Sequence, residues 1–306
     1  MNYKKLIDPE LKKIARKTPY NKAVLFVANI YQTIAFALTK VPQVITERTI
    51  AIKGFNGLKM KVNVFEPKNY KSDLPCLIYV HGGAFSYKAS VYQKKLACIY
   101  AAKVKCRVFF PDYHLIPKYA FPAPYKDVVE LYKYLMANSS ELRINSKKIG
   151  ITGESAGGLL SALVSNNYKK ELIEKPCFQM LIYPVTDSRM ETESMKKYTD
   201  TPLWNSINNK KMWDFFSVGM ESKKKAASPM LNDLPHEIPK TYIETTEYDC
   251  LREEGILYAK KLRDEGACVE LNDVKRAFHG YDSAIKSSIT IKNVKKRIAF
   301  MRKCFM

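Results

Sequence analysis

Gly153-Glu154-Ser155-Ala156-Gly157-Gly158 carries a G-x-S-x-G motif, directly after the apolar stretch KIGIT (148–152) and directly before LLSALVSNNY (159–168). This order predicts a strand, a sharp turn and a helix, with the serine on the turn. A nucleophilic serine has to project from such a turn, and the glycines leave room for strained backbone and close packing. The motif therefore predicts Ser155 as the nucleophile of an enzyme.

Further strand patterns lie on both sides of this motif. ERTIAIKGF (47–55) and LKMKVNVFEP (58–67) are joined at Asn56-Gly57, which predicts an antiparallel hairpin. The following apolar stretches alternate with helical patterns, as buried parallel strands do. We expect a mostly parallel sheet of eight strands, flanked by helices. The later strands are expected at 74–80, 106–113, 148–153, 177–184, 240–248 and 268–274, and helices at 92–103, 124–136, 156–168, 253–265 and 282–303.

Two regions do not follow this alternation, residues 1–45 and about 188–225. We expect both to form a cap over a catalytic domain of residues 46–306. The first region contains AVLFVANIYQTIAFAL (23–38), which as a helix is shorter than the hydrocarbon core of a bilayer. It is expected to pack over the catalytic domain, and the alternative is a surface helix that dips into lipid beside the basic segment 4–22.

HGGAF (81–85) follows the expected strand 74–80. The bare backbone of such a loop supplies N–H groups that stabilise the oxyanion of a tetrahedral intermediate. Gly82, Gly83, Ala84 and Ala156 are the predicted donors.

Asp249 and His279 complete the predicted catalytic set. Each follows an expected strand, and the chain order serine, acid, histidine is the order found with this type of motif. Glu247 is a second, weaker candidate for the acid. The other three histidines are expected to be structural or solvent-exposed: His81, His114 and His236.

Composition limits the other functions. The formal net charge is +21, but the lysines are spread along the chain and accompany no nucleic-acid-binding motif, so no nucleic acid partner is expected. The seven cysteines form no CxxC pair, which argues against a disulfide framework and a zinc cluster. We expect neither cofactor nor metal. No secretory signal is recognised at the N-terminus, so a cytoplasmic location is expected.

The motifs HGGAF, PDYHLIPKYAFPAPYKDV, GESAGG, YDCLREEG and FHGY occur in this order between about residues 75 and 282. This series resembles the hormone-sensitive-lipase-like branch of the α/β-hydrolase esterases. The resemblance implies an α/β-hydrolase fold with a helical cap and carboxylesterase activity. The family loop usually reads HGGG, so Ala84 occupies the third glycine position, and Glu154 stands where aspartate is common.

The sequence thus predicts a serine carboxylesterase that hydrolyses small esters, with short acyl or aryl groups, through an acyl-enzyme. Two alternatives stay open: an amide, formamide or acetyl-sugar hydrolase that uses the same triad, and a non-catalytic binding protein on a hydrolase fold. A homodimer is expected only by analogy with relatives.

Overall fold

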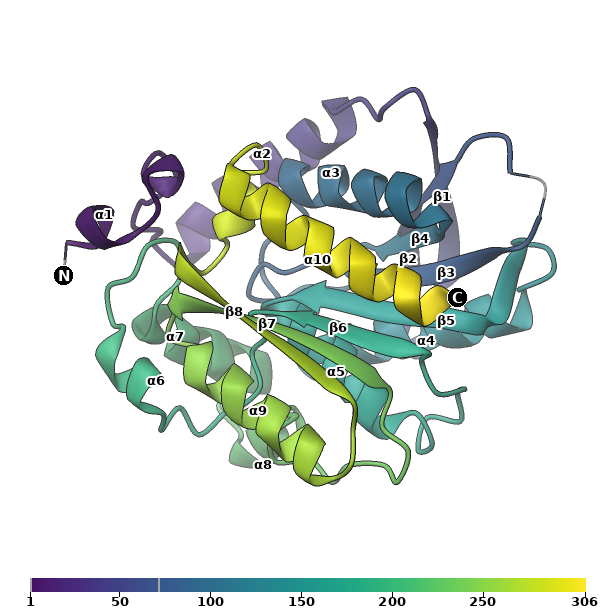
Figure 1. Ribbon diagram of the computed structural model, residues 1–306. Coiled ribbons are helices and arrows are strands. Elements are labelled where there is room, and N and C mark those ends of the chain that lie inside the picture. Colours follow the sequence, from purple (N-terminus) through teal and green to yellow (C-terminus); the bar gives the residue numbers. More distant parts are fainter. Residues whose placement is uncertain (1, 71) are drawn as a thin grey trace.

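A twisted eight-stranded sheet runs through the centre of the computed structural model, which describes residues 2–70 and 72–306 (Figure 1). The strands are ordered β1-β2-β4-β3-β5-β6-β7-β8. β1 and β2 pair antiparallel, as do β2 and β4, and the remaining pairs are parallel. The predicted mostly parallel sheet is confirmed. Its strands are β1 (Ile45–Lys53), β2 (Lys59–Pro67), β3 (Leu74–Val80), β4 (Arg107–Pro111), β5 (Ile144–Glu154), β6 (Phe178–Ile182), β7 (Lys240–Tyr248) and β8 (Val269–Phe278).

The predicted hairpin joins β1 to β2. Asn56 and Gly57 both have positive φ, 52° and 74°, a conformation that asparagine and glycine adopt more readily than other residues. The turn sets the register in which Lys53 faces Lys59.

Helices cover both faces of the sheet (Figure 1). α3 (Val91–Tyr100) and α10 (Ser288–Phe305) lie on one face, and α4 (Ala123–Ala137), α5 (Ala156–Asn167) and α9 (Arg252–Asp264) lie on the other. Because both faces are covered, central strands such as β4 and β6 are buried at every residue, which explains their continuous apolar sequences.

The predicted start of the last helix at 282 is wrong. Tyr281–Ser283 form a short 3-10 turn, η4, and α10 begins only at Ser288. Ser287 ends the intervening loop, and its side chain accepts a hydrogen bond from the N–H of Thr290. Because α10 starts after Asp282, this residue lies outside the helix, and its carboxylate accepts a hydrogen bond from the buried Arg297 of α10.

The two irregular regions of the sequence contain short helices. The N-terminal region holds α1 (Tyr3–Leu6), the 3-10 turn η1 (Pro9–Leu11) and α2 (Lys22–Leu38). Between β6 and β7 lie α6 (Glu193–Lys197), α7 (Ser206–Ser217) and α8 (Glu221–Ala226). None of the helices in the described ranges combines the length and the apolar character needed to cross a bilayer.

Candidate active site

Ser155 lies on a strained turn between β5 and α5. Its φ of 54° and ψ of −119° are unfavourable for a residue with a side chain, and the backbone is held in place because its N–H donates to the carbonyl of Ile182 at 2.9 Å. The close packing explains the glycines around it. A Cβ added to Gly157 would collide with the carbonyl oxygen of Val80 on β3. The turn thus presents the serine hydroxyl at the carboxyl end of the sheet.

A chain of hydrogen bonds connects Ser155, His279 and Asp249. His279 Nε2 lies 2.9 Å from Ser155 Oγ, and His279 Nδ1 lies 2.8 Å from Asp249 Oδ2. Ser155 and His279 are each 7% exposed, and Asp249 is fully buried. The structure therefore brings together the three residues that the sequence singles out, although they come from loops after β5, β8 and β7.

The Asp249 carboxylate is fixed by further hydrogen bonds. Thr246 Oγ1 donates to Oδ2 at 3.0 Å, and the N–H of Leu251 donates to Oδ1 at 3.0 Å. Glu247, the weaker candidate, accepts instead from the N–H of Arg276 at 2.8 Å. The geometry thus favours Asp249 as the partner of the imidazole.

The loop that follows β3 lies beside Ser155 with its backbone N–H groups available. Within the described residues, the N–H groups of Gly82, Gly83 and Ala84 donate no hydrogen bond to another protein group. Ala156 is the first residue of α5, where a backbone N–H has no carbonyl partner in its own helix. Gly83 has φ of 121°, and a Cβ there would lie only 2.9 Å from Tyr87. Ala84 has φ of 52°, so alanine holds a left-handed conformation that the more usual glycine adopts without strain.

Residues of the N-terminal region hold this loop. Asn29 on α2 donates from Nδ2 to the carbonyl of Ser86 at 2.9 Å and accepts at Oδ1 from the N–H of Lys88 at 2.8 Å. The Tyr20 hydroxyl contacts Ser86 Oγ. The sequence analysis missed both residues. The one available signal was that Asn29 is among the few polar residues, with Gln32 and Thr33, of a largely apolar helical stretch.

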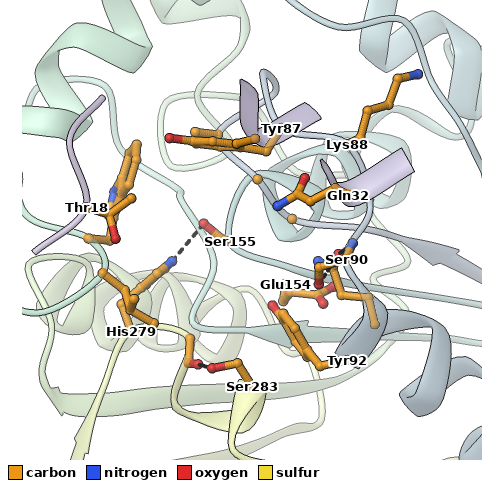
Figure 2. Close-up of a pocket in the computed structure, with 18 of the residues that line it drawn as sticks. Thr18, Gln32, Tyr87, Lys88, Ser90, Tyr92, Glu154, Ser155, His279 and Ser283 are labelled. Atoms are coloured by element: carbon orange, nitrogen blue, oxygen red, sulfur yellow. Dashed lines mark hydrogen bonds between the residues drawn. The ribbon is translucent and has the colours of Figure 1, made fainter. Parts of the chain in front are cut away.

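A cavity of about 700 Å³ opens onto Ser155 (Figure 2). α2 contributes the small or apolar side chains of Val24, Ala28 and Ala35, and the insertion after β6 contributes Leu203 and Trp204. Polar side chains also face it, as Figure 2 shows with Ser155 near the centre: Gln32, Tyr87, Ser90, Tyr92, Glu154 and His279. Residues from both irregular regions of the chain thus form walls of the same cavity.

The other histidines lie elsewhere. Burial lowers the pKa of His81 to about 4, and its ring stacks on Tyr113 with centroids 4.4 Å apart. His114 contacts Asp127 at 2.8 Å, and His236 is exposed. No cluster of three or more His, Cys, Asp or Glu side chains suited to a metal ion occurs in the part of the chain that the structure describes.

Comparison with known proteins identifies the family. A family model described as the α/β-hydrolase fold matches residues 77–283. The chain belongs to the α/β-hydrolase family. Among the relatives of this α/β-hydrolase, the carboxylesterase NlhH of Mycobacterium tuberculosis is 28% identical over 242 residues, covering 78% of this chain and 75% of the relative. Neutral cholesterol ester hydrolase 1 of Mus musculus is 26% identical, covering 74% of this chain and 72% of the relative.

A solved structure is similar over nearly the full length of the chain. The structure titled bacterial heroin esterase superposes with a TM-score of 0.90 at 28% identity, covering 99% of both chains. The predicted resemblance to the hormone-sensitive-lipase-like esterases is confirmed.

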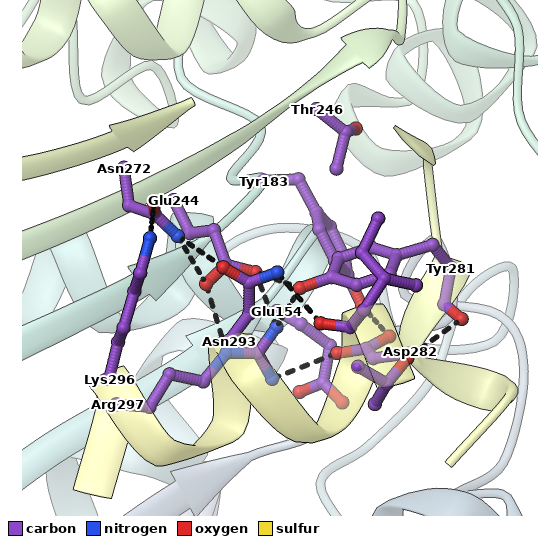
Figure 3. Close-up of polar contacts among 12 residues, drawn as sticks. Glu154, Tyr183, Glu244, Thr246, Asn272, Tyr281, Asp282, Asn293, Lys296 and Arg297 are labelled. Carbon is purple, nitrogen blue, oxygen red and sulfur yellow. Dashed lines mark hydrogen bonds and ion pairs between the residues drawn. The ribbon is translucent and has the colours of Figure 1, made fainter. Parts of the chain in front are cut away.

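A buried ionic network supports the His279 loop of this α/β-hydrolase (Figure 3). Arg297 on α10 donates to Glu244 Oε1 on β7 at 2.5 Å and to Asp282 Oδ2 at 2.9 Å. Tyr183 donates to the other oxygen of Asp282 at 2.6 Å, and its ring packs against the imidazole of His279. Burial works against the charge of Glu244, but the guanidinium of Arg297 outweighs it and lowers the pKa of that carboxyl. The network thus ties the loop after β8 to α10 and to the neighbouring strand β7.

Glu154, directly before Ser155, is buried without a cationic partner among the described residues. Tyr79 donates to its Oε1 at 2.8 Å, whereas Oε2 accepts no hydrogen bond within the geometric limits from the described residues. Burial, and to a smaller extent the charge of Asp282, raise the pKa of Glu154 to about 7. We therefore interpret Glu154 as a group that supports the turn between β5 and α5 mainly in its protonated form.

This pKa predicts a pH-dependent stability difference between the wild type and Glu154→Gln. Because the folded state holds the Glu154 proton more tightly than the unfolded chain, its contribution to stability is complete below about pH 4.5 and is lost as the pH rises through about 7. The wild type should lose stability relative to the variant as the pH rises. The difference in free energy of unfolding, variant minus wild type, is expected to increase by about 2 to 3 kcal/mol between about pH 5 and about pH 8. Urea unfolding at a series of pH values measures it. Glu221→Gln on the surface of α8 controls for the loss of one charge, and a pH-independent difference would contradict the prediction.

Proposed function

We propose that this protein is a serine carboxylesterase that hydrolyses small esters, with short acyl or aryl groups, through an acyl-enzyme intermediate. The observation that carries the proposal is the hydrogen-bonded series Ser155, His279 and Asp249, of which Ser155 and His279 line the cavity. The names of the relatives, a carboxylesterase and a cholesterol ester hydrolase, support ester bonds as the target.

In the proposed cycle, His279 Nε2 takes the proton of Ser155 as Oγ attacks the ester carbonyl, forming a C–O bond and a tetrahedral oxyanion. Asp249 holds the imidazole in the required tautomer and stabilises its protonated form. The C–O bond to the leaving alcohol then breaks, and His279 returns the proton to that alcohol. Water, deprotonated by the same imidazole, hydrolyses the acyl-enzyme to release the acid and restore Ser155.

The oxyanion is assigned to the N–H groups of Gly82, Gly83, Ala84 and Ala156. Three of them donate to no other protein group among the described residues, and the fourth starts a helix, where the partial positive charge also favours an anion. These donors gain most when the negative charge develops, so they lower the barrier rather than tighten ground-state binding.

We assign residues 1–45 and 188–225 to the cap and residues 46–306 to the catalytic domain that carries it. Five of the cap residues that line the cavity are small or apolar, which favours an apolar group of limited size beside them: Val24, Ala28, Ala35, Leu203 and Trp204. A homodimer and a cytoplasmic location stay predictions. The two free edges of the described sheet, β1 and β8, are the places where an edge-to-edge dimer would form.

A substrate panel tests the proposal. Soluble p-nitrophenyl esters from acetate to octanoate are compared with the matching anilides, formamides, acetylated sugars and emulsified triolein. We expect kcat/KM for the short esters to exceed that for the amides and the triglyceride by at least about tenfold, or about 1.4 kcal/mol of transition-state stabilisation. Faster turnover of the amides or acetyl sugars would reassign the substrate, and efficient hydrolysis of triolein would reverse the size preference.

A further inference from the structure

The outward face of α2 is apolar along its whole length. In this helix, all of whose residues are described, Leu25 alone is buried, and six large apolar side chains point to solvent. A helix of a globular protein normally turns such side chains towards the core, and a contiguous exposed apolar patch marks a binding surface. The six are Phe26 (69% exposed), Val27 (66%), Ile30 (48%), Tyr31 (71%), Ile34 (55%) and Leu38 (76%).

The opposite face of α2 is already engaged. Asn29 makes two hydrogen bonds to the loop of residues 86–88, and Ala28, Gln32 and Ala35 line the cavity. Rotation of the helix to bury its apolar face would break both hydrogen bonds and remove part of the cavity wall. The apolar face is therefore left for something outside the chain.

The charges around α2 indicate which kind of partner its apolar face binds. Residues 11–46 contain six lysines and arginines and no acidic residue. Lys22 is the first residue of α2, Lys40 follows its end, and neither forms an ion pair with any described residue. Arg16 and Lys17 line the same cavity as Tyr31. Two copies of the chain that met through α2 would bring these cations together, whereas an anionic surface would attract them.

We propose that α2 lies in the surface of an anionic lipid layer, with its apolar face among the upper acyl chains and its flanking lysines at the headgroups. A helix of 17 residues is about 25 Å long, which is too short to cross the layer but suits a position parallel to it. The consequence for catalysis rests on the proposed function. Because α2 is also a wall of the cavity, docking would place the active-site cavity beside apolar esters dissolved in the lipid.

Vesicle sedimentation with the full chain tests the inference without any need for turnover. The wild type is mixed with vesicles of phosphatidylcholine plus phosphatidylglycerol, or of phosphatidylcholine alone, and compared with Phe26→Ser/Ile30→Ser. Leu172→Ser/Leu257→Ser is the matched control, because both leucines are exposed and lie outside the N-terminal region. Activity on soluble p-nitrophenyl acetate and the oligomeric state by analytical ultracentrifugation are measured on the same samples.

We expect the wild type and the control to bind anionic vesicles, and the α2 variant to partition at least tenfold less while keeping its activity on the soluble ester. Binding should weaken when NaCl rises from about 0.05 M to about 0.5 M, because salt screens the lysines. Equal sedimentation of the α2 variant and the wild type, or no vesicle binding by the wild type, would overturn the proposal. A wild-type dimer that the α2 substitutions dissociate would assign the face to a second copy instead. Ser155→Ala should bind vesicles like the wild type, so a failed esterase assay and a failed docking assay are distinguishable.

Discussion

Replacement of Ser155 by alanine is expected to lower kcat on a soluble p-nitrophenyl ester by roughly 10⁵-fold to 10⁶-fold, because the attacking oxygen is lost. His279→Ala should cost about as much, since its Nε2, 2.9 Å from Ser155 Oγ, is the base in the proposed cycle. The double variant should be no worse than either single variant, because the two residues act as one unit. Steady-state kinetics and labelling with a fluorophosphonate, which reacts with an activated serine, measure the effect.

His236→Ala is the matched control for the histidine substitution. His236 is exposed and outside the cavity, so its loss should leave kcat/KM within about twofold of wild type, the range usual for a surface change. Circular dichroism checks that Ser155→Ala is folded. A Ser155→Ala protein that keeps more than a few per cent of the activity would refute the assignment, and a wild type that is neither active nor labelled would favour the non-catalytic binding protein.

Local sequence patterns were enough to predict those parts of the candidate site that lie within a single strand and the loop that follows it. The glycines around Ser155 and in the loop of His81 lie so close to neighbouring atoms that a Cβ would not fit. This requirement is visible in the sequence as a glycine motif. Asp249 and His279 could be chosen because their chain order and their positions after strands limit the choice.

Residues that act across the fold could not be predicted in this way. Asn29 lies 57 residues from Ser86, whose carbonyl it binds, and Glu244 lies 53 residues from Arg297. Such pairs depend on tertiary packing, which leaves no fixed spacing in the chain. The start of α10 was misplaced for the same reason: residues 282–287 continue a helical pattern, but Asp282 is held outside the helix by Tyr183 and Arg297.

Arg297→Met is expected to lower the free energy of unfolding by about 3 to 5 kcal/mol, because it leaves Glu244 and Asp282 buried without their cation. All three side chains are at most 1% exposed, so water cannot replace the guanidinium without opening the core. Urea unfolding monitored by circular dichroism measures the loss. The activity of the variant at low temperature should also fall, since Asp282 anchors the loop that carries His279.

Two further variants separate the buried network from a general effect on α10. Arg302→Met on the same helix removes an exposed arginine that contacts the carbonyl of Lys103, and should cost less than about 1 kcal/mol. The triple variant Arg297→Met/Glu244→Gln/Asp282→Asn removes the charges together and should recover at least half of the stability lost in Arg297→Met, because no uncompensated charge is left in the core. If the triple variant were as unstable as Arg297→Met, the loss would come from the packing of the arginine side chain, and the electrostatic account of how the His279 loop is held would be wrong.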